Sequence, residues 1–304
     1  MKKIINPLSI DGKDYHHKVR LFDQPFYEAE MPLSLERSMD SLDHLMQRDA
    51  ARYKGLIPDN FGWKEKVLLC YNQGVSLEDI GIRPLPLQTG TSYQLTAWRK
   101  DPDNQFGVNP GYVVSVHGIT ITSDEYLVFG RRGGNSTTAG QGEAAPGGNV
   151  SDEGKDPLFT TYFNESIEEL DIDANHLIDP KIVAVQNDHH FRPTINFIFA
   201  AHTTYSFAEV EERHYQAMLP VLEARANGKP TIHAEAREAT MNAGLRNIDA
   251  WEKDYLVAIP LKKNTIEECI NSRTIPGKDE TLNLLSSSLG DLQVAVELLK
   301  RNEF

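Results

Sequence analysis

Hydrophobic and polar residues follow a helical period between Pro157 and Ile172, in the segment PLFTTYFNESIEELDI. The apolar positions form one narrow stripe along the predicted helix, at Phe159, Phe163, Ile167 and Leu170. The acidic positions fall at i, i+3 and i+4 on the opposite side, at Glu165, Glu168 and Glu169. The pattern therefore predicts a short amphipathic helix whose polar face carries three carboxylates.

The residues before this helix have a different pattern. From Gly111 to Arg131 they are rich in β-branched and aromatic side chains, with a break at Ser123 and Asp124. We predict two strands joined by a turn. The segment from Gly130 to Val150 is rich in glycine and predicts a loop, in which backbone can approach a ligand closely.

The remaining periodicity predicts further strands and helices on both sides of this unit. Strands are expected over 17–26, 66–71, 93–98, 181–186, 194–203 and 251–261. Helices are expected over 34–52, 206–227, 234–243 and 281–300, with Pro220 kinking or splitting the second of these. Strands packed between helices predict an α/β protein, a three-layer α/β/α sandwich with a mixed sheet.

The chain divides unevenly near residue 105. The segment KDPDNQFGVNPG, from Lys100 to Gly111, is rich in turn-forming residues and predicts a connection. Residues 1–105 then form an N-terminal α+β extension without evident chemistry, suited to substrate selection or dimer formation. Residues 106–304 form the main domain, which ends in the C-terminal helix.

Composition narrows the function classes. The formal net charge of −13 argues against a general nucleic-acid-binding surface, which needs a basic footprint. It leaves room for an anionic small molecule, because a metal and local arginines can reverse the field inside a site. Two cysteines are too few for a disulfide framework or a zinc site. No apolar run is long enough for a signal peptide or a membrane span, so a cytoplasmic location without membrane contact is expected.

The three carboxylates of the predicted helix have no basic partner within it, because the segment contains neither Lys nor Arg. They also lie toward its C-terminal end, where the helix dipole disfavours negative charge. Like charges about 4 Å apart repel by about 4 kcal/mol at an effective dielectric constant of 20. A cation between the carboxylates relieves this repulsion, and clustered oxygen ligands suit Mg²⁺ or Mn²⁺. The alternative is a solvated acidic face without function.

The segment also resembles a known family. Pro146, Gly147 and Gly148, followed by NESIEELDI at residues 164–172, are similar to the conserved box of the Nudix hydrolases. The three glutamates match that box in order and spacing. The differences are Asp156 for a glutamate, Asn164 for an arginine, Ser166 for an apolar residue and Asp171 for the closing glycine.

The resemblance implies a Nudix fold and hydrolysis of a nucleoside diphosphate linked to another group, such as a nucleotide sugar or ADP-ribose. It implies Mg²⁺, or Mn²⁺, held by the carbonyl of Gly148 and the carboxylates of Glu165, Glu168 and Glu169. It further implies that one glutamate activates water, for which we choose Glu165. Carboxylates of a later loop are the alternatives, namely Glu209, Glu211, Glu212, Glu235 and Glu238.

Several features refine or oppose this interpretation. Arg131 and Arg132 can clamp phosphate oxygens, and His189 and His190 can contact the substrate, although arginines at strand ends and histidines in loops are common on solvated surfaces. The pieces NFGWKEKVLLC, SYQLTAWRK and WEKDYLVAIPL are more diffusely similar to the UDP-sugar-hydrolysing branch of the family. The altered box also fits a catalytically inactive Nudix-fold module that senses a nucleotide. Homodimers are frequent in the family.

Overall fold

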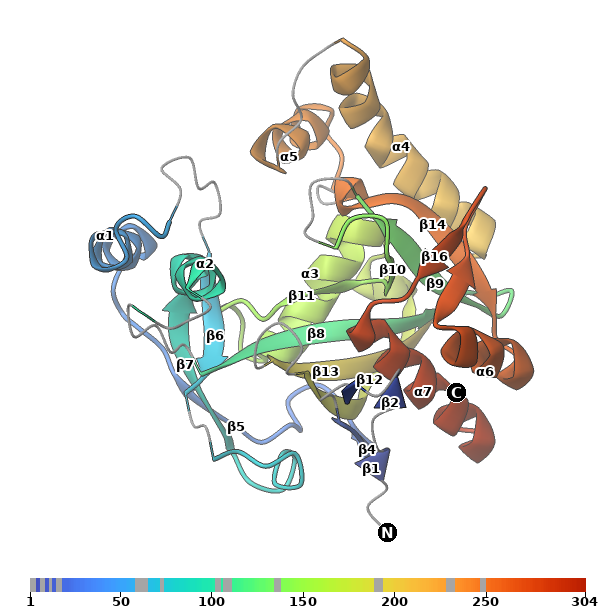
Figure 1. Ribbon diagram of the computed structural model, residues 1–304, viewed down its shortest axis with the longest axis horizontal. Helices are drawn as coiled ribbons and strands as arrows, with labels where there is room; N and C mark the ends of the chain where they lie inside the picture. The colour runs from blue at the N-terminus through green and yellow to red at the C-terminus, as the bar shows by residue number, and fades with distance from the viewer. Residues whose placement is uncertain are drawn as a thin grey trace.

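A large mixed β-sheet organises the protein, seen here in a computed structural model (Figure 1). The structure describes residues 4–5, 9–10, 13–14, 18–57, 65–71, 74–101, 105, 111–133, 138–188, 194–227, 233–246 and 250–304. The main path of the sheet contains, in spatial order, β1 (Ile4–Ile5), β4 (Lys18–Phe26), β12 (Leu177–Asp188), β13 (Thr194–Thr203), β8 (Tyr112–Ile121), β6 (Lys66–Cys70), β7 (Leu85–Thr91) and β5 (Leu33–Glu36). Strands β13 and β8 pair in parallel, as do β5 and β7, whereas β12 and β13 are antiparallel.

Four further strands extend the sheet beside β8. Strand β9 (Tyr126–Arg132) pairs with β8, with β10 (Gly142–Ala144) and with β14 (Lys253–Pro260), and β11 (Gly147–Asn149) pairs with β8. Two separate hairpins are formed by β2 (Ser9–Ile10) with β3 (Lys13–Asp14), and by β15 (Thr274–Pro276) with β16 (Thr281–Asn283). Part of the segment expected to be a glycine-rich loop, residues 130–150, therefore consists of short strands within the sheet.

Helices cover both faces of the sheet. On one face lies α3 (Pro157–Leu170), where the ring of Tyr162 stacks on Phe199 of β13 with 4.3 Å between centroids. On the other face lies α7 (Ser286–Arg301), whose Leu289 and Leu292 share a core cluster with Ile198 of β13. Phe199 and Ile198 are neighbours on one strand, so their side chains point to opposite faces. The two clusters confirm the predicted α/β class and its three layers.

The other helices lie around this sandwich. They are α1 (Leu42–Arg52), α2 (Ser92–Lys100), α4 (Phe207–Ala226), α5 (His233–Asn242) and α6 (Lys263–Ser272), with short 3-10 helices η1 (Ala174–His176) and η2 (Ala250–Glu252). The predicted helix over 34–52 begins only at Leu42 and is preceded by β5. The predicted C-terminal helix begins at Ser286, after β16, and α6 was not predicted.

One predicted element was wrong and one predicted helix break is absent, each for an identifiable reason. Residues 93–98 form a helix rather than a strand, because Thr91 and Gln94 make a reciprocal capping box that starts α2. Pro220 does not split α4, which continues to Ala226. Met218 and Val221, on either side of Pro220, are both buried in one small core. This shared packing offsets the hydrogen bond that proline removes from the helix.

Residues of the predicted N-terminal extension contribute strands to the same sheet. Strand β4 pairs with β12, and β6 pairs with β8. Arg20 of β4 also donates to the carbonyls of Leu77 and Ile80, each over 2.6 Å. The division of the chain into residues 1–105 and 106–304 stays a prediction. No helix in the described part of the chain is both long and apolar enough to cross a bilayer.

Candidate active site around the acidic helix

The helix α3 begins at a strong local signal. Asp156 is its N-cap, accepting a hydrogen bond from the backbone N–H of Phe159 at 3.3 Å, and Pro157 follows at the first helical position. The second carboxylate oxygen of Asp156 accepts from the N–H of Ala29 at 2.6 Å. Asp156, which stands where the Nudix pattern has its first glutamate, thus starts the helix and attaches the segment after β4 to it.

The end of α3 explains two other differences from the Nudix pattern. Asp171 is in the left-handed conformation, with φ of 55°, which the closing glycine of the pattern adopts without strain. Its carboxylate accepts from Arg213 at 2.7 Å and from Arg246 at 2.9 Å. The hydroxyl of Ser166 donates to the carbonyl of Tyr162 at 2.7 Å, so this buried polar group is satisfied within the helix. Both substitutions are compatible with the helix.

The buried residues of α3 differ from the narrow apolar stripe that the sequence predicts. Phe159 and Leu170 are buried as expected, whereas Phe163 and Ile167 are only partly buried. Glu169, expected on the polar face, is 0% exposed. The helix is therefore enclosed on a second side, where its last acidic turn meets β14 and the segment before it.

Glu165 lies against the backbone of β11. A Cβ atom placed on Gly148 would lie 1.9 Å from Oε1 of Glu165, so a side chain at this position would displace the carboxylate from where it lies. Glu165 and Glu168 are both partly buried, and Asn164 is exposed. The structure thus brings together two of the predicted metal-binding residues, Glu165 and Gly148, at the middle of the short strand β11.

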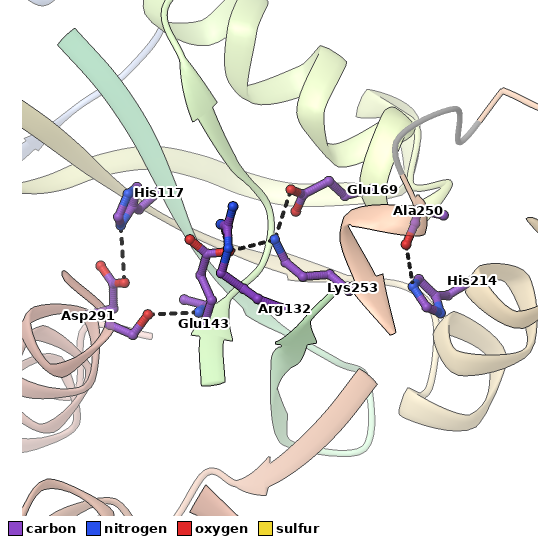
Figure 2. Close-up of polar contacts among 10 residues, drawn as sticks. His117, Arg132, Glu143, Glu169, His214, Ala250, Lys253 and Asp291 are labelled. Atoms are coloured by element: carbon purple, nitrogen blue, oxygen red, sulfur yellow. Dashed lines mark hydrogen bonds and ion pairs between the residues drawn. The ribbon is translucent and has the colours of Figure 1, made fainter. Parts of the chain in front are cut away.

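Glu169 instead meets a buried lysine (Figure 2). The ammonium of Lys253, at the start of β14, donates to Oε1 of Glu169 at 3.1 Å and to Oε2 of Glu143 at 2.7 Å. Glu143 also accepts a hydrogen bond from Arg132 of β9. The side chain of Lys253 is 0% exposed and that of Glu169 is 1% exposed. We call Arg132, Glu143, Glu169 and Lys253 the buried ion quartet.

The strand register explains how the quartet assembles. Glu143 pairs with Gly130 across β10 and β9, and Arg132 lies two residues along β9 from Gly130, so all three positions share one face of the sheet. The stem of Lys253 crosses Gly130, where a Cβ atom would lie 2.8 Å from Cγ and Cδ of the lysine. Gly130 therefore provides the space that lets Lys253 reach Glu169.

Arg131 points to the opposite face of β9 from Arg132. Its guanidinium pairs with Asp254, and its Nε donates to Glu280 at 2.8 Å. The two arginines predicted as one phosphate clamp therefore lie apart and have different partners. Only Arg132 is directed toward the acidic end of α3.

Electrostatics within the quartet follow from burial and pairing. Burial alone would raise the pKa of Glu143, but the nearby charges of Lys253 and Arg132 outweigh it and hold that pKa at about 2. Burial lowers the pKa of Lys253, and the two carboxylates more than reverse this effect. Burial raises the pKa of Glu169 and outweighs the opposing charge of Lys253, and the nearby carboxylate of Glu143 raises it further. Of the two carboxylates, Glu143 is the more strongly stabilised as an anion.

A buried histidine supports the segment that carries Lys253. The Nε2 atom of His214, in α4, lies 2.9 Å from the carbonyl oxygen of Ala250, three residues before Lys253. Burial lowers the pKa of His214 to about 4, so the imidazole is neutral at pH 7 and donates from this nitrogen. A second pair, His117 of β8 with Asp291 of α7 at 3.3 Å, lies near Glu143 on the side of α7 (Figure 2).

The other predicted residues are distributed as follows. Ser206 donates to Glu209, Lys278 pairs with Glu211 and Gln216 donates to Glu212, while Glu238 is exposed on α5. His189 and His190 lie outside the described residues, as does the side chain of Glu235. Where the structure places side chains, no three His, Cys, Asp or Glu residues converge closely enough to hold a metal ion.

Lys253 and Glu143 were not identified from the sequence. Lysine is among the residues least often buried, and nothing in WEKDYLVAIPL marks this one as an exception. The available signal was indirect, since α3 contains three carboxylates and no base. That imbalance predicts a cation beside the helix, and in the structure Lys253 supplies one to Glu169.

Comparison with known proteins gives distant structural similarities. A Deinococcus radiodurans protein matches at 17% identity and a TM-score of 0.26, over 31% of this chain and 57% of that one. A Francisella tularensis bifunctional NMN adenylyltransferase/ADP ribose pyrophosphatase matches at 14% identity and 0.38, over 69% and 49%. A Nudix family hydrolase from Clostridium perfringens matches at 13% identity and 0.32, over 62% and 99%. The chain thus spans 57% and 49% of the length of the first two proteins.

No family model and no curated protein sequence matches the chain. Identities of 13–17% with TM-scores below 0.4 do not establish a family. A functional assignment must therefore rest on the residues around α3 themselves.

Proposed function

We propose that the chain is a Nudix-type hydrolase that cleaves the diphosphate linkage of a nucleoside diphosphate derivative. One observation carries this proposal. Glu165 lies directly on the backbone of Gly148, in a space that a single methyl group would fill. A carboxylate held against the backbone of β11, with a second partly buried carboxylate three residues on at Glu168, presents the oxygen ligands that Mg²⁺ or Mn²⁺ prefers.

The residues present fit such an ion at the Glu165 end of α3. The carbonyl of Gly148 and the carboxylates of Glu165 and Glu168 would hold it. A bound divalent ion supplies screening of the diphosphate charge and lowers the pKa of water. Glu169, the remaining ligand that the sequence predicts, already accepts a hydrogen bond from Lys253.

The chain's own residues have distinct roles in this proposal. Glu165 accepts the proton from the attacking water, from a position fixed by the rigid helix α3. Arg132, which pairs with Glu143, lies toward the acidic end of α3 and would face the phosphate groups, whereas Arg131 pairs with Asp254 and Glu280 on the other face. A nucleotide sugar or ADP-ribose is the substrate class expected from the resemblance.

A second candidate is a module that binds a nucleotide without cleaving it. The pairing of Glu169 with a buried ammonium favours this candidate, since that carboxylate is neutralised without any bound ion. The two candidates differ in one measurable property, which is turnover.

A product assay separates them. The wild-type protein, Glu165→Gln and the exposed-helix control Glu223→Gln are incubated with Mg²⁺ or Mn²⁺ and UDP-glucose, UDP-galactose, ADP-ribose, dinucleotides or nucleoside triphosphates, and products are followed by ³¹P NMR. We expect turnover of at least one diphosphate, a fall of about 10²–10⁴-fold for Glu165→Gln, and no change for Glu223→Gln. Binding of a nucleotide without turnover under either metal would favour the module and contradict the hydrolase.

A further inference from the structure

The quartet around Lys253 has a balanced charge. Glu143 and Glu169 contribute two negative charges, and Lys253 and Arg132 contribute two positive ones, through direct hydrogen bonds. A buried carboxylate is costly unless it is paired, and in the described structure Glu169 is paired with Lys253 through Oε1. Glu169 therefore does not need a bound metal ion to be tolerated at 0% exposure.

The ammonium is also fixed in position. It bridges β10 and α3 by bonds of 2.7 Å to Glu143 and 3.1 Å to Glu169, and its stem lies in the groove over Gly130. A divalent ion on Glu169 would have to lie within a few ångströms of the ammonium of Lys253. Arg132, which donates to Glu143, places a second positive charge in the same cluster. Their repulsion disfavours metal at Glu169, although its Oε2 lacks a hydrogen-bond partner in the described structure.

We propose that Lys253 is a tethered cation that occupies the place beside Glu169 and excludes divalent metal from that carboxylate. Lys253 is thus a positioning residue for Glu169, and metal binding is confined to the Glu165 end of α3. This inference deepens the proposed function and rests on it for the ion at Glu165. It divides the three glutamates of α3 into two ligands and one internal ion pair.

Manganese binding to the full-length protein tests the inference without using activity. Mn²⁺ affinity is measured by EPR titration and calorimetry for the wild type, Glu165→Gln and Glu169→Gln. We expect at least a tenfold loss of affinity for Glu165→Gln and less than a threefold change for Glu169→Gln. An equal loss in both variants would show that Glu169 is a ligand and would overturn the inference.

Lys253→Met provides the second arm. Removing the ammonium opens Glu169 to metal, so this variant should gain a Mn²⁺-dependent rise in melting temperature beyond that of the wild type. Adding Glu169→Gln to Lys253→Met should abolish the gain. If Lys253→Met folds only in the presence of Mn²⁺, that requirement is also a gained stabilisation by the metal and supports the inference. An identical Mn²⁺ response in Lys253→Met and the wild type would contradict the inference.

The two arms keep the inference separate from the proposed function. If the wild type binds no Mn²⁺ and cleaves nothing, the hydrolase proposal fails, yet a metal response gained by Lys253→Met still supports exclusion by the lysine. If the wild type cleaves its substrate and Glu169→Gln loses Mn²⁺, the hydrolase proposal stands and the inference fails.

Discussion

Two glutamates of α3, four residues apart on one side of the helix, have contrasting environments. Glu165 is partly buried and lies on the backbone of Gly148, while Glu169 is fully buried and bonded to Lys253. Each environment depends on a glycine, since Gly148 makes space for a carboxylate and Gly130 makes space for a lysine stem. The contrast teaches that residues of one acidic motif can separate into a reactive end and a structural end.

The largest expected loss of stability comes from a substitution at the structural end of α3, where Glu169 pairs with Lys253. Lys253→Met leaves Glu169 buried without its cation, which should lower the free energy of unfolding by about 3–5 kcal/mol. Urea denaturation at pH 7, without divalent metal, measures this loss. Glu165→Gln is the matched change at the other end and should cost no more than about 1 kcal/mol. Equal costs for the two variants would remove the distinction between the ends.

Acid should also weaken the structural end, through His214. Its pKa of about 4 in the folded protein lies below the ordinary 6.5, so the unfolded chain binds an extra proton between these values. The contribution of about 3 kcal/mol is fully present above pH 6.5 and is lost as the pH falls toward 4. Unfolding free energies of the wild type and His214→Gln, measured from pH 7.5 to 4, check this. The variant keeps an N–H donor for Ala250 and should lack this part of the pH dependence; parallel profiles would contradict the assignment.

The two glycines allow each end to be disturbed separately. An added Cβ should cost about 1–3 kcal/mol at either position, by displacing Lys253 in Gly130→Ala and Glu165 in Gly148→Ala. Turnover and Mn²⁺ affinity should fall mainly in Gly148→Ala, and denaturation measures the stability of both variants. Gly147→Ala is the control, since its Cβ would come no closer than 3.3 Å to a neighbouring atom. A larger loss of Mn²⁺ affinity in Gly130→Ala than in Gly148→Ala would reverse the roles assigned to the two ends.

Elements of the fold could be predicted where the residues that determine them are close together in the sequence. The helix α3 was predicted from Pro157 to Ile172 and runs from Pro157 to Leu170, because the apolar period is a local signal. In α2, the aromatic residues Tyr93 and Trp98 favoured a strand, and the capping box at Thr91 and Gln94 prevailed.

The site was predictable only in part for the same reason. The spacing of Glu165, Glu168 and Glu169 is read directly from the sequence, and it predicts that the side chains share a helix face. The partner of Glu169 is Lys253, which is 84 residues away in the sequence, on strand β14. Its burial depends on Gly130 and on the register of β9 with its neighbours, neither of which leaves a local pattern.

The smallest expected effect concerns the arginine that the Nudix pattern contains and this chain lacks. Asn164 is exposed on α3, so Asn164→Arg should change the free energy of unfolding by less than about 0.5 kcal/mol. Urea denaturation and the Mn²⁺ titration measure its effect. If the new arginine stabilised the protein by more than 1 kcal/mol, it would be reaching the glutamates, and the division between the two ends would depend on position 164.

The pairing of β4 with β12 has a consequence for biosynthesis. Leu21 of β4 is registered with Ala184 of β12, some 160 residues later in the chain. At about 5–20 residues per second, a ribosome needs on the order of 10–30 s to make the intervening polypeptide. During that interval the apolar side chains of Val19, Leu21 and Phe22 lack the strand that pairs with theirs in the finished sheet. The early strand β4 therefore stays without β12 until synthesis has passed residue 188.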